Sequence, residues 1–216
     1  MFLNFDLAKA WDYENGFYLT SHKTRLSKLL AHYELYKMIT GLPGFILECG
    51  VYKGASLIRF ATFRDVLESQ YSRKIIGFDA FGKFPRSGDS DDINFIEKFE
   101  DYGGDGISKE ELEKVLVQKE IINYELIEGN ILQKVPLYVK QHPELRIALL
   151  HIDVDVYEPT KVILQHLYDR VVSNGIIVLD DYATVAGETL AVEEFFRNTK
   201  IEKLSISHIP SFIKKQ

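Results

Sequence analysis

Five short apolar runs constrain the fold of this chain more than any other feature. They cover residues 45–47, 74–78, 124–128, 147–152 and 176–179, and most are followed directly by an acid or a glycine turn. Runs that are apolar throughout are typical of strands buried on both faces, as in a parallel sheet covered by helices. Patterns with helical spacing lie between the runs, so the sequence predicts an α/β fold with a doubly wound, mostly parallel sheet.

The composition and charge exclude several other classes of protein. The chain has 216 residues, of which 46% are hydrophobic and 27% charged, and a formal net charge of −6. This predicts one globular domain over 1–216. The negative charge disfavours a nucleic-acid surface, and no apolar run approaches the ~18 residues of a membrane span. The single cysteine, Cys49, cannot form an internal disulfide. Together with an N-terminus that lacks the basic start of a signal peptide, it predicts a soluble cytoplasmic protein.

Two parts of the chain lie outside the alternation of strands and helices. Residues 1–43 have helical spacing, and we interpret them as an N-terminal helical extension. Residues 85–122 form a long excursion between two strands, with a Gly/Asp-rich loop and a capping box at Ser108 and Glu111. This helical insertion is either a lid over the site or a decoration without function.

A glycine turn after the first apolar run indicates a ligand close to the backbone. The run leads into Glu48, then into Gly50 and Gly54, and then into a helical pattern. The nicotinamide fingerprint is excluded because Glu48 and Lys53 occupy two of its three glycine positions. Asp79 ends the second run, where doubly wound folds place a carboxylate for the ribose hydroxyls. The turn and Asp79 together predict a nucleoside site, although the turn alone fits a structural strand-to-helix connection.

Four acids follow the two later runs. Asp153 and Asp155 come after 147–152, and Asp180 and Asp181 come after 176–179. Carboxylates that converge at the carboxyl ends of neighbouring strands repel one another unless a cation is present, and carboxylate oxygens suit Mg²⁺. An acid left uncoordinated could serve as the general base. The alternative is that these acids only cap the helices that follow.

The D-x-D pattern also resembles the haloacid-dehalogenase phosphatases and the nucleotide-sugar glycosyltransferases. Too few positions separate Asp153 from Asp180 for the Thr and Lys elements of the phosphatases. In the glycosyltransferases, the glycine turn and Asp79 would have no role.

Four motifs in order and spacing resemble the macrocin O-methyltransferase family, which are S-adenosylmethionine-dependent and metal-dependent sugar O-methyltransferases. The motifs begin at Glu48, Gly77, Asp153 and Gly175. The resemblance implies a class I methyltransferase (Rossmann-like) fold with a seven-stranded sheet, S-adenosylmethionine and Mg²⁺ as cofactors, a small-molecule sugar acceptor and a homodimer.

The resemblance also assigns roles to residues. For the cofactor it implies Asp79 at the ribose and Gly129 and Asn130 near the adenine, with Asp153 as a further cofactor contact. At the methionine part of the cofactor it implies Glu48, Gly50, Val51, Tyr52, Gly54 and Ser56. It implies Asp153, Asp180 and Asp181 as metal ligands and Asp155 as the base, so that Asp153 and Asp155 are the catalytic pair. Tyr157 and Tyr182 follow the acidic pairs, and they either line an acceptor pocket or pack under the adjacent helix.

The chain departs from the family pattern at three places. Ala55 stands where the family usually has glycine, Ala80 to Lys83 replaces a Ser-Phe-Glu-Gly segment, and no Thr precedes Pro136. The sequence therefore favours an S-adenosylmethionine-dependent sugar O-methyltransferase. The alternatives are a metal-dependent methyltransferase of catechol-like phenols, a D-x-D phosphatase and a non-catalytic nucleoside-binding module.

Overall fold

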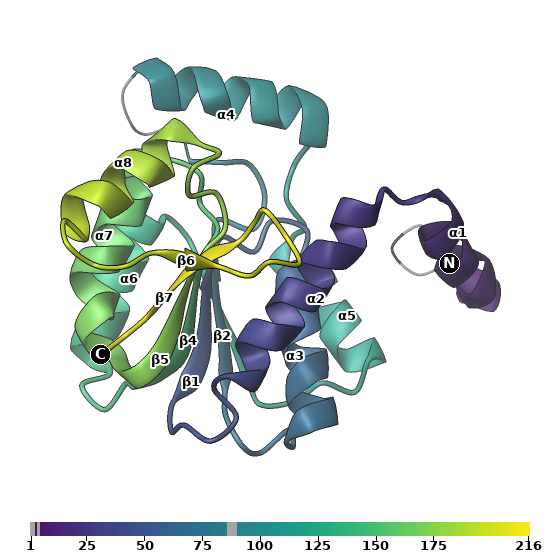
Figure 1. The fold of residues 1–216 in the computed structure, drawn as a ribbon. Coiled ribbons are helices and arrows are strands. Elements are labelled where there is room, and N and C mark those ends of the chain that lie inside the picture. Colours follow the sequence, from purple (N-terminus) through teal and green to yellow (C-terminus); the bar gives the residue numbers. More distant parts are fainter. Residues whose placement is uncertain (1–2, 4, 86–89) are drawn as a thin grey trace.

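A seven-stranded sheet runs through the middle of the molecule in the computed structural model, which describes residues 3, 5–85 and 90–216 (Figure 1). The strand order is β3-β2-β1-β4-β5-β7-β6. The strands are β1 Phe45–Cys49, β2 Ile75–Asp79, β3 Tyr124–Glu128, β4 Ile147–Ile152, β5 Val171–Leu179, β6 Glu202–Lys203 and β7 Ser211–Lys214. The first five are parallel, and β7 is antiparallel to both β5 and β6. This confirms the predicted doubly wound, mostly parallel sheet.

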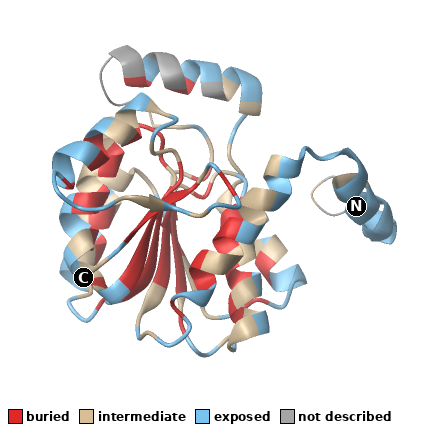
Figure 2. Cartoon of the chain, in the orientation of Figure 1, coloured by how far each residue is buried: buried red, intermediate tan, exposed pale blue. Residues whose placement is uncertain are grey.

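Helices cover both faces of the sheet, since neighbouring residues of each central strand point to opposite sides and both are buried (Figure 2). The helices are α1 Ala10–Thr20, α2 Lys23–Lys37, α3 Ala55–Leu67, α4 Ser90–Gly103, α5 Lys109–Gln118, α6 Ile131–Gln141, α7 Tyr157–Leu167 and α8 Ala186–Phe195. One core cluster joins the sheet to α6, α7 and α8, and the other joins it to α2, α3 and α5. In β1, for example, Leu47 belongs to the first cluster and Ile46 to the second.

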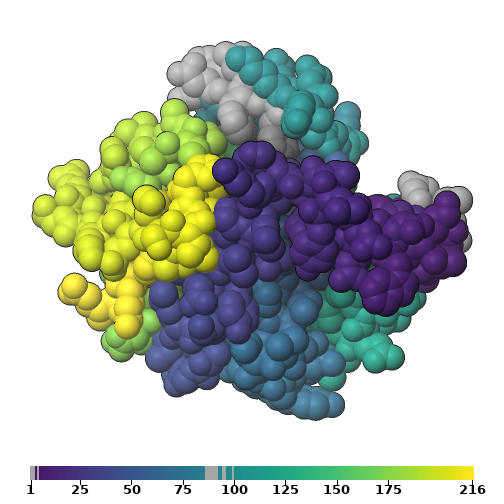
Figure 3. Space-filling view, turned by 45° about the vertical axis from the view of Figure 1, so that its right-hand side comes forward, coloured from purple at the N-terminus to yellow at the C-terminus, as the bar shows by residue number. Residues whose placement is uncertain are grey.

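The N-terminal extension has two helices with different surroundings. Helix α2 packs along α3 and buries Leu35 and Tyr36 in the core. Helix α1 buries no residue, and it stands away from the rest of the molecule (Figures 1 and 3). No helix among the described residues is long and apolar enough to cross a membrane.

The predicted insertion 85–122 consists of two helices in different places. Helix α5 is the crossover helix between β2 and β3, because its Leu112 and Leu116 are buried against the sheet. Helix α4 lies apart from both helical layers. In the view of Figure 1 it lies at the top of the molecule, above α8. Of the described residues of the expected lid, α4 lies outside the regular fold, and residues 86–89 are outside the described part of the chain.

Candidate active site

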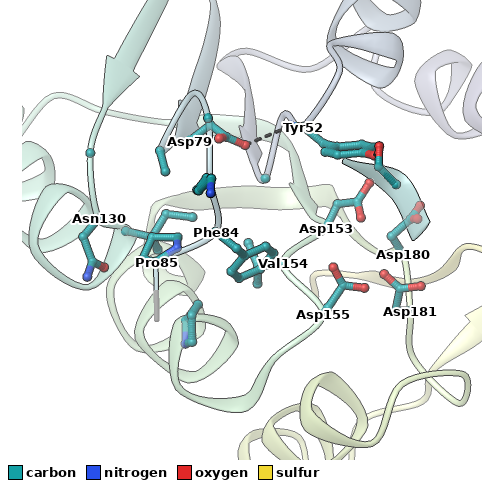
Figure 4. Close-up of a pocket in the computed structure, with 18 of the residues that line it drawn as sticks. Tyr52, Asp79, Phe84, Pro85, Asn130, Asp153, Val154, Asp155, Asp180 and Asp181 are labelled. Atoms are coloured by element: carbon teal, nitrogen blue, oxygen red, sulfur yellow. Dashed lines mark hydrogen bonds between the residues drawn. The ribbon is translucent and has the colours of Figure 1, made fainter. Parts of the chain in front are cut away.

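A cavity of about 380 Å³ opens at the carboxyl ends of the parallel strands. The strand order reverses between β1 and β4, and ligands of doubly wound sheets bind at such a point. The cavity is lined by residues that follow β1, β2, β3, β4 and β5, among them Gly50, Asp79, Asn130, Asp153 and Asp181. Its size lies within the range of small-molecule sites. Figure 4 shows Asp79 and Asn130 at one end and the four aspartates at the other.

Gly50 lets the ends of β1 and β4 approach each other. Its φ is +90°, and a Cβ at this position would lie 1.7 Å from the carbonyl oxygen of Asp153. No side chain fits there, so glycine is required at this position for the packing of the two strand ends.

Asp79 is held rigidly at the cavity wall by backbone donors. Its Oδ2 accepts hydrogen bonds from the N–H groups of Val51 at 2.6 Å and Tyr52 at 2.9 Å, and its Oδ1 accepts one from Phe81 at 2.7 Å. A carboxylate offers about four acceptor positions, so one of them is left for a ligand hydroxyl.

The residues predicted near the adenine, Gly129 and Asn130, lie close to Asp79. The N–H of Gly129 donates to the carbonyl of Asp79, and the Oδ1 of Asn130 accepts from the N–H of Leu132 at the start of α6. The Asn130 side-chain oxygen thus caps α6. These residues fit S-adenosylmethionine because the fixed carboxylate of Asp79 and the glycines Gly50 and Gly129 border one cavity.

Four of the residues predicted at the methionine part of the cofactor do not line the cavity. The Val51 and Ser56 side chains are buried, and Gly54 precedes α3 with a φ of +80°. Glu48 is fully buried below the cavity, where its Oε1 lies 2.8 Å from the Nδ1 of His151. Because strand side chains alternate between faces, Glu48 points into the helical layer, away from the opening. The structure therefore places Glu48 elsewhere than the prediction did.

Three carboxylates converge at the opposite end of the cavity. Asp153, Asp155 and Asp181 each offer an oxygen, and these oxygens all lie within 4.8 Å of one another (Figure 4). Burial raises the pKa of Asp153 and of Asp155 well above the usual range, with further increases from Asp180 and Asp181 respectively. Burial and Asp180 also raise the pKa of Asp181. Such a set is unfavourable without a cation, and its oxygen donors fit Mg²⁺.

Asp180 has a different environment from the other three acids. Its Oδ2 accepts a hydrogen bond from Lys28 at 2.5 Å, and its Oδ1 lies 3.3 Å from the Nε2 of His151. Burial opposes ionisation of Asp180, but the hydrogen bond from His151 and the nearby His32 and Lys28 outweigh it, so its pKa lies well below the usual range. The three converging carboxylates therefore include Asp155, which is predicted to be the base. They do not include Asp180, which is predicted to be a metal ligand.

His151 lies between two acids, Glu48 and Asp180. Burial opposes its charged form, but the hydrogen bonds to Asp180 and Glu48 outweigh this and raise the pKa of His151 to about 10. His151 is therefore an imidazolium that neutralises the buried carboxylates below the site. The adjacent His32 is neutral, because burial lowers its pKa to about 4.

Glu188 at the start of α8 joins the two acidic turns. Its Oε1 accepts a hydrogen bond from the N–H of Asp181 at 3.1 Å, and its own N–H donates to the carbonyl of Asp155 at 3.0 Å. Asp155 has a φ of +64°, so this contact holds a strained residue in place.

The two predicted substrate tyrosines do not line the cavity. The Tyr157 hydroxyl donates to Glu194 at 2.6 Å, and the Tyr182 hydroxyl donates to Glu193 at 3.4 Å. Both glutamates belong to α8, so the structure corresponds to the alternative in which the tyrosines pack against the adjacent helix.

Helix α4 is attached near both of its ends. The buried Asp92 accepts a hydrogen bond from the N–H of Tyr157 at the start of α7, at 3.2 Å. The carbonyl of Gly103 accepts hydrogen bonds from the Tyr52 hydroxyl and the Lys53 ammonium, both at 2.6 Å. Tyr102 and Gly103 line the cavity, so the position of α4 determines how open it is.

Sequence reasoning did not identify Arg25 and Lys28, which line the cavity from α2. With His32 they occupy steps of three and four along one helix, which places them on one face. The signal that could have revealed Arg25 and Lys28 is this row of polar and cationic residues, which runs beside the apolar residues of α2.

The fold and the site define a class I methyltransferase domain. The sheet order, the glycine turn, Asp79 and the acidic strand ends agree with a cofactor-binding cleft at the switch point. A family model described as macrocin-O-methyltransferase (TylF) matches residues 11–212, and the chain belongs to this family.

Two curated relatives are O-methyltransferases by name. One is the 8-demethyl-8-(2,3-dimethoxy-alpha-L-rhamnosyl)-tetracenomycin-C 4'-O-methyltransferase of Streptomyces olivaceus, 29% identical over 66% of this chain and 54% of that protein. The other is the mycinamicin III 3''-O-methyltransferase of Micromonospora griseorubida, 29% identical over 68% of this chain and 58% of that protein. The matched part thus spans little more than half the length of these relatives.

Solved structures of methyltransferases share the fold. The calicheamicin methyltransferase CalS11 aligns with a TM-score of 0.77 and 26% identity over 97% of this chain and 86% of that chain. The O-methyltransferase NovP aligns with a TM-score of 0.76 and 20% identity over 88% of this chain and 80% of that chain. The likeness to NovP shows the fold alone.

Proposed function

We propose that this protein transfers a methyl group from S-adenosylmethionine to a hydroxyl of a sugar, with Mg²⁺ in the acidic site. The observation that carries the proposal is the placement of Asp153, Asp155 and Asp181 at one end of a cavity whose other end holds Asp79. The relatives' names support a sugar acceptor, such as a nucleotide sugar or a glycosylated metabolite.

The residues have separate tasks in this proposal. Asp79 and the backbone at Gly50 hold the cofactor, which supplies the methyl group. Asp153 and Asp181 would hold Mg²⁺, with Asp180 as a further ligand, and a bound ion would lower the pKa of an acceptor hydroxyl and orient it. Asp155 accepts the proton of that hydroxyl, since it lies beside Asp153 and Asp181 at the same end of the cavity. The cavity wall excludes water and orients the acceptor oxygen.

The proposal is tested by calorimetric titration of S-adenosylhomocysteine, first with Mg²⁺ and then with EDTA. We expect binding in both conditions, together with a separate Mg²⁺ isotherm that is lost in Asp181→Asn. The matched control is Asp169→Asn, an exposed acid outside the cavity. If S-adenosylhomocysteine binds neither with Mg²⁺ nor with EDTA, the cofactor assignment is overturned.

The acceptor class is tested by transfer of labelled methyl groups. We expect transfer to a nucleotide sugar or a glycosylated macrolide and none to a dihydroxyphenyl compound. Transfer only to the dihydroxyphenyl compound would indicate the catechol-type reaction instead.

We also propose that the protein is a homodimer in which α1 packs against a second copy. Support comes from α1 itself, which buries none of its residues although it carries Trp11, Tyr18 and Leu19.

A further inference from the structure

We propose that Lys28 is the built-in cation of the acidic site, and that Mg²⁺ binds fully only by displacing the Lys28 ammonium from Asp180. The inference rests on the proposed function, because it takes the acidic site to be a divalent-cation site. The inference adds Lys28, a residue of the N-terminal extension, to the metal site, and the charge of Lys28 determines how strongly the ion binds.

Lys28 and His151 together give both carboxylate oxygens of Asp180 a cationic partner. The Lys28 ammonium lies 2.5 Å from Oδ2, and His151 lies 3.3 Å from Oδ1. The exposed fraction of the Asp180 side chain is 3% and that of Lys28 is 20%, so water competes little with this pair. A metal ion that takes Oδ2 of Asp180 as a ligand therefore competes with the Lys28 ammonium for that oxygen.

Lys28 is the partner that can move. His151 is fully buried and also bonded to Glu48, whereas Lys28 lines the cavity. A lysine carries its charge on a flexible four-carbon stem, so the ammonium can turn into the cavity without a change in the backbone.

The charges show why the ammonium and Mg²⁺ exclude each other. Asp153 and Asp181 also act on Lys28, so its ammonium lies within the field of three of the four acids. Two cations a few ångströms apart repel strongly where little water is present. The ammonium offsets part of the acidic charge in the metal-free protein, and a divalent ion that replaces it supplies twice the charge.

This arrangement makes metal binding depend on the N-terminal extension. Lys28 lies on α2, ahead of the first strand, while all four acids follow β4 and β5. The extension is therefore part of the site, and it keeps the acidic cluster compensated before the ion arrives.

The test is calorimetric titration of Mg²⁺ into the metal-free protein, in mildly alkaline buffer so that protons compete less for the carboxylates. Lys28→Met keeps the length of the side chain and removes the charge, and we expect it to bind Mg²⁺ at least about tenfold more tightly than the wild type. Lys28→Arg keeps the charge and should bind as weakly as the wild type. Lys23→Met, an exposed lysine on the same helix, makes the same change in net charge and should also bind as the wild type does.

A second readout does not depend on affinity. Metal-free Lys28→Met should melt at a lower temperature than the wild type, and Mg²⁺ should raise its melting temperature by more. Lys28→Gln, which retains a hydrogen-bond donor for Asp180, replaces Lys28→Met if the latter does not fold.

Equal or weaker Mg²⁺ binding by Lys28→Met or Lys28→Gln, relative to the wild type, would overturn the proposal for Lys28 and leave the metal site intact. Absence of Mg²⁺ binding in every variant, with S-adenosylhomocysteine still bound, would overturn the metal site and the Lys28 proposal together. These two failures are therefore distinguishable.

Discussion

The Nδ1 of His151 lies 2.8 Å from the Oε1 of Glu48, and neither side chain is exposed to solvent. Glu48 therefore supports the site from below, through the imidazolium that also faces Asp180. The other carboxylate oxygen of Glu48, Oε2, has no hydrogen-bond partner among the described residues, so the contact with His151 is the hydrogen bond that fixes this side chain.

Removal of Glu48 should therefore destabilise the protein more than it changes cofactor binding. Glu48→Ala leaves a buried imidazolium with one fewer anion, and we expect a loss of roughly 3–5 kcal/mol in the free energy of unfolding, measured in urea. Glu48→Gln keeps an acceptor and should lose less. Glu34→Ala, which breaks an exposed pair with Lys37, is the control and should change stability little. A Glu48→Gln protein of wild-type stability that no longer binds S-adenosylhomocysteine would contradict this assignment and favour direct contact with the cofactor.

Gly50→Ala should disrupt the site, because the new Cβ would overlap the carbonyl oxygen of Asp153 at a φ of +90°. We expect a loss of at least about 3 kcal/mol in stability and no detectable binding of S-adenosylhomocysteine. Gly16→Ala is the control, since nothing lies within 4 Å of its added Cβ, and it should change stability by less than about 1 kcal/mol. Wild-type binding by Gly50→Ala would mean that the turn has another conformation in solution.

Asp155→Asn should slow the reaction without weakening cofactor binding. A general base contributes about 10²–10⁴-fold to the rate, so kcat should fall by that factor while S-adenosylhomocysteine affinity stays unchanged. Single-turnover methyl transfer and calorimetry measure the two quantities, with Asp169→Asn as the control. A variant that keeps its kcat but loses Mg²⁺ affinity would show that Asp155 is a metal ligand and not the base, as its position in the converging set also allows.

The sheet could be predicted from the sequence because its central strands are mostly apolar and end on recognisable residues. β3 and β4 coincide with the predicted runs at 124–128 and 147–152. β5 begins at Val171, well before the predicted 176, because its first residues include the polar Ser173 and Asn174 at the less buried end of the strand. The sequence pattern also merged α4 and α5 into one insertion, since only packing shows that Leu112 and Leu116 contact the sheet.

The candidate site was predicted less completely than the fold. Motifs placed Asp79 and the four acids, because strand ends of a parallel sheet meet at one edge. They could not reveal that Asp180 pairs with Lys28, which lies 152 positions away in the sequence. Nor could they show that Glu48 and the two tyrosines point away from the cavity, because side-chain direction depends on the partners available in three dimensions.

Asp92 should hold α4 over the cavity. Asp92→Ala removes a carboxylate acceptor from the N–H of Tyr157, a contact worth about 1.5–3 kcal/mol. We therefore expect S-adenosylhomocysteine to bind roughly tenfold more weakly and amide hydrogens of α4 to exchange faster. Asp101→Ala, an exposed acid on the same helix, should change neither quantity. Faster exchange in α4 with unchanged affinity would show that the helix is a decoration and not a lid.

Helix α1 should be needed for dimerisation and not for folding. Trp11, Tyr18 and Leu19 share one face of the helix and are 76%, 64% and 84% exposed, which is unusual for side chains of this size. Trp11→Glu with Leu19→Glu should convert a dimer into a monomer in light scattering after size exclusion, and the monomer should still unfold cooperatively because α1 buries no residue within its own chain. Tyr71→Glu, 82% exposed in the turn after α3, is the control and should leave the dimer intact. A wild-type protein that is monomeric at all concentrations would remove the dimer from the proposal, and a dimer that persists in the double variant would place its interface elsewhere on the molecule.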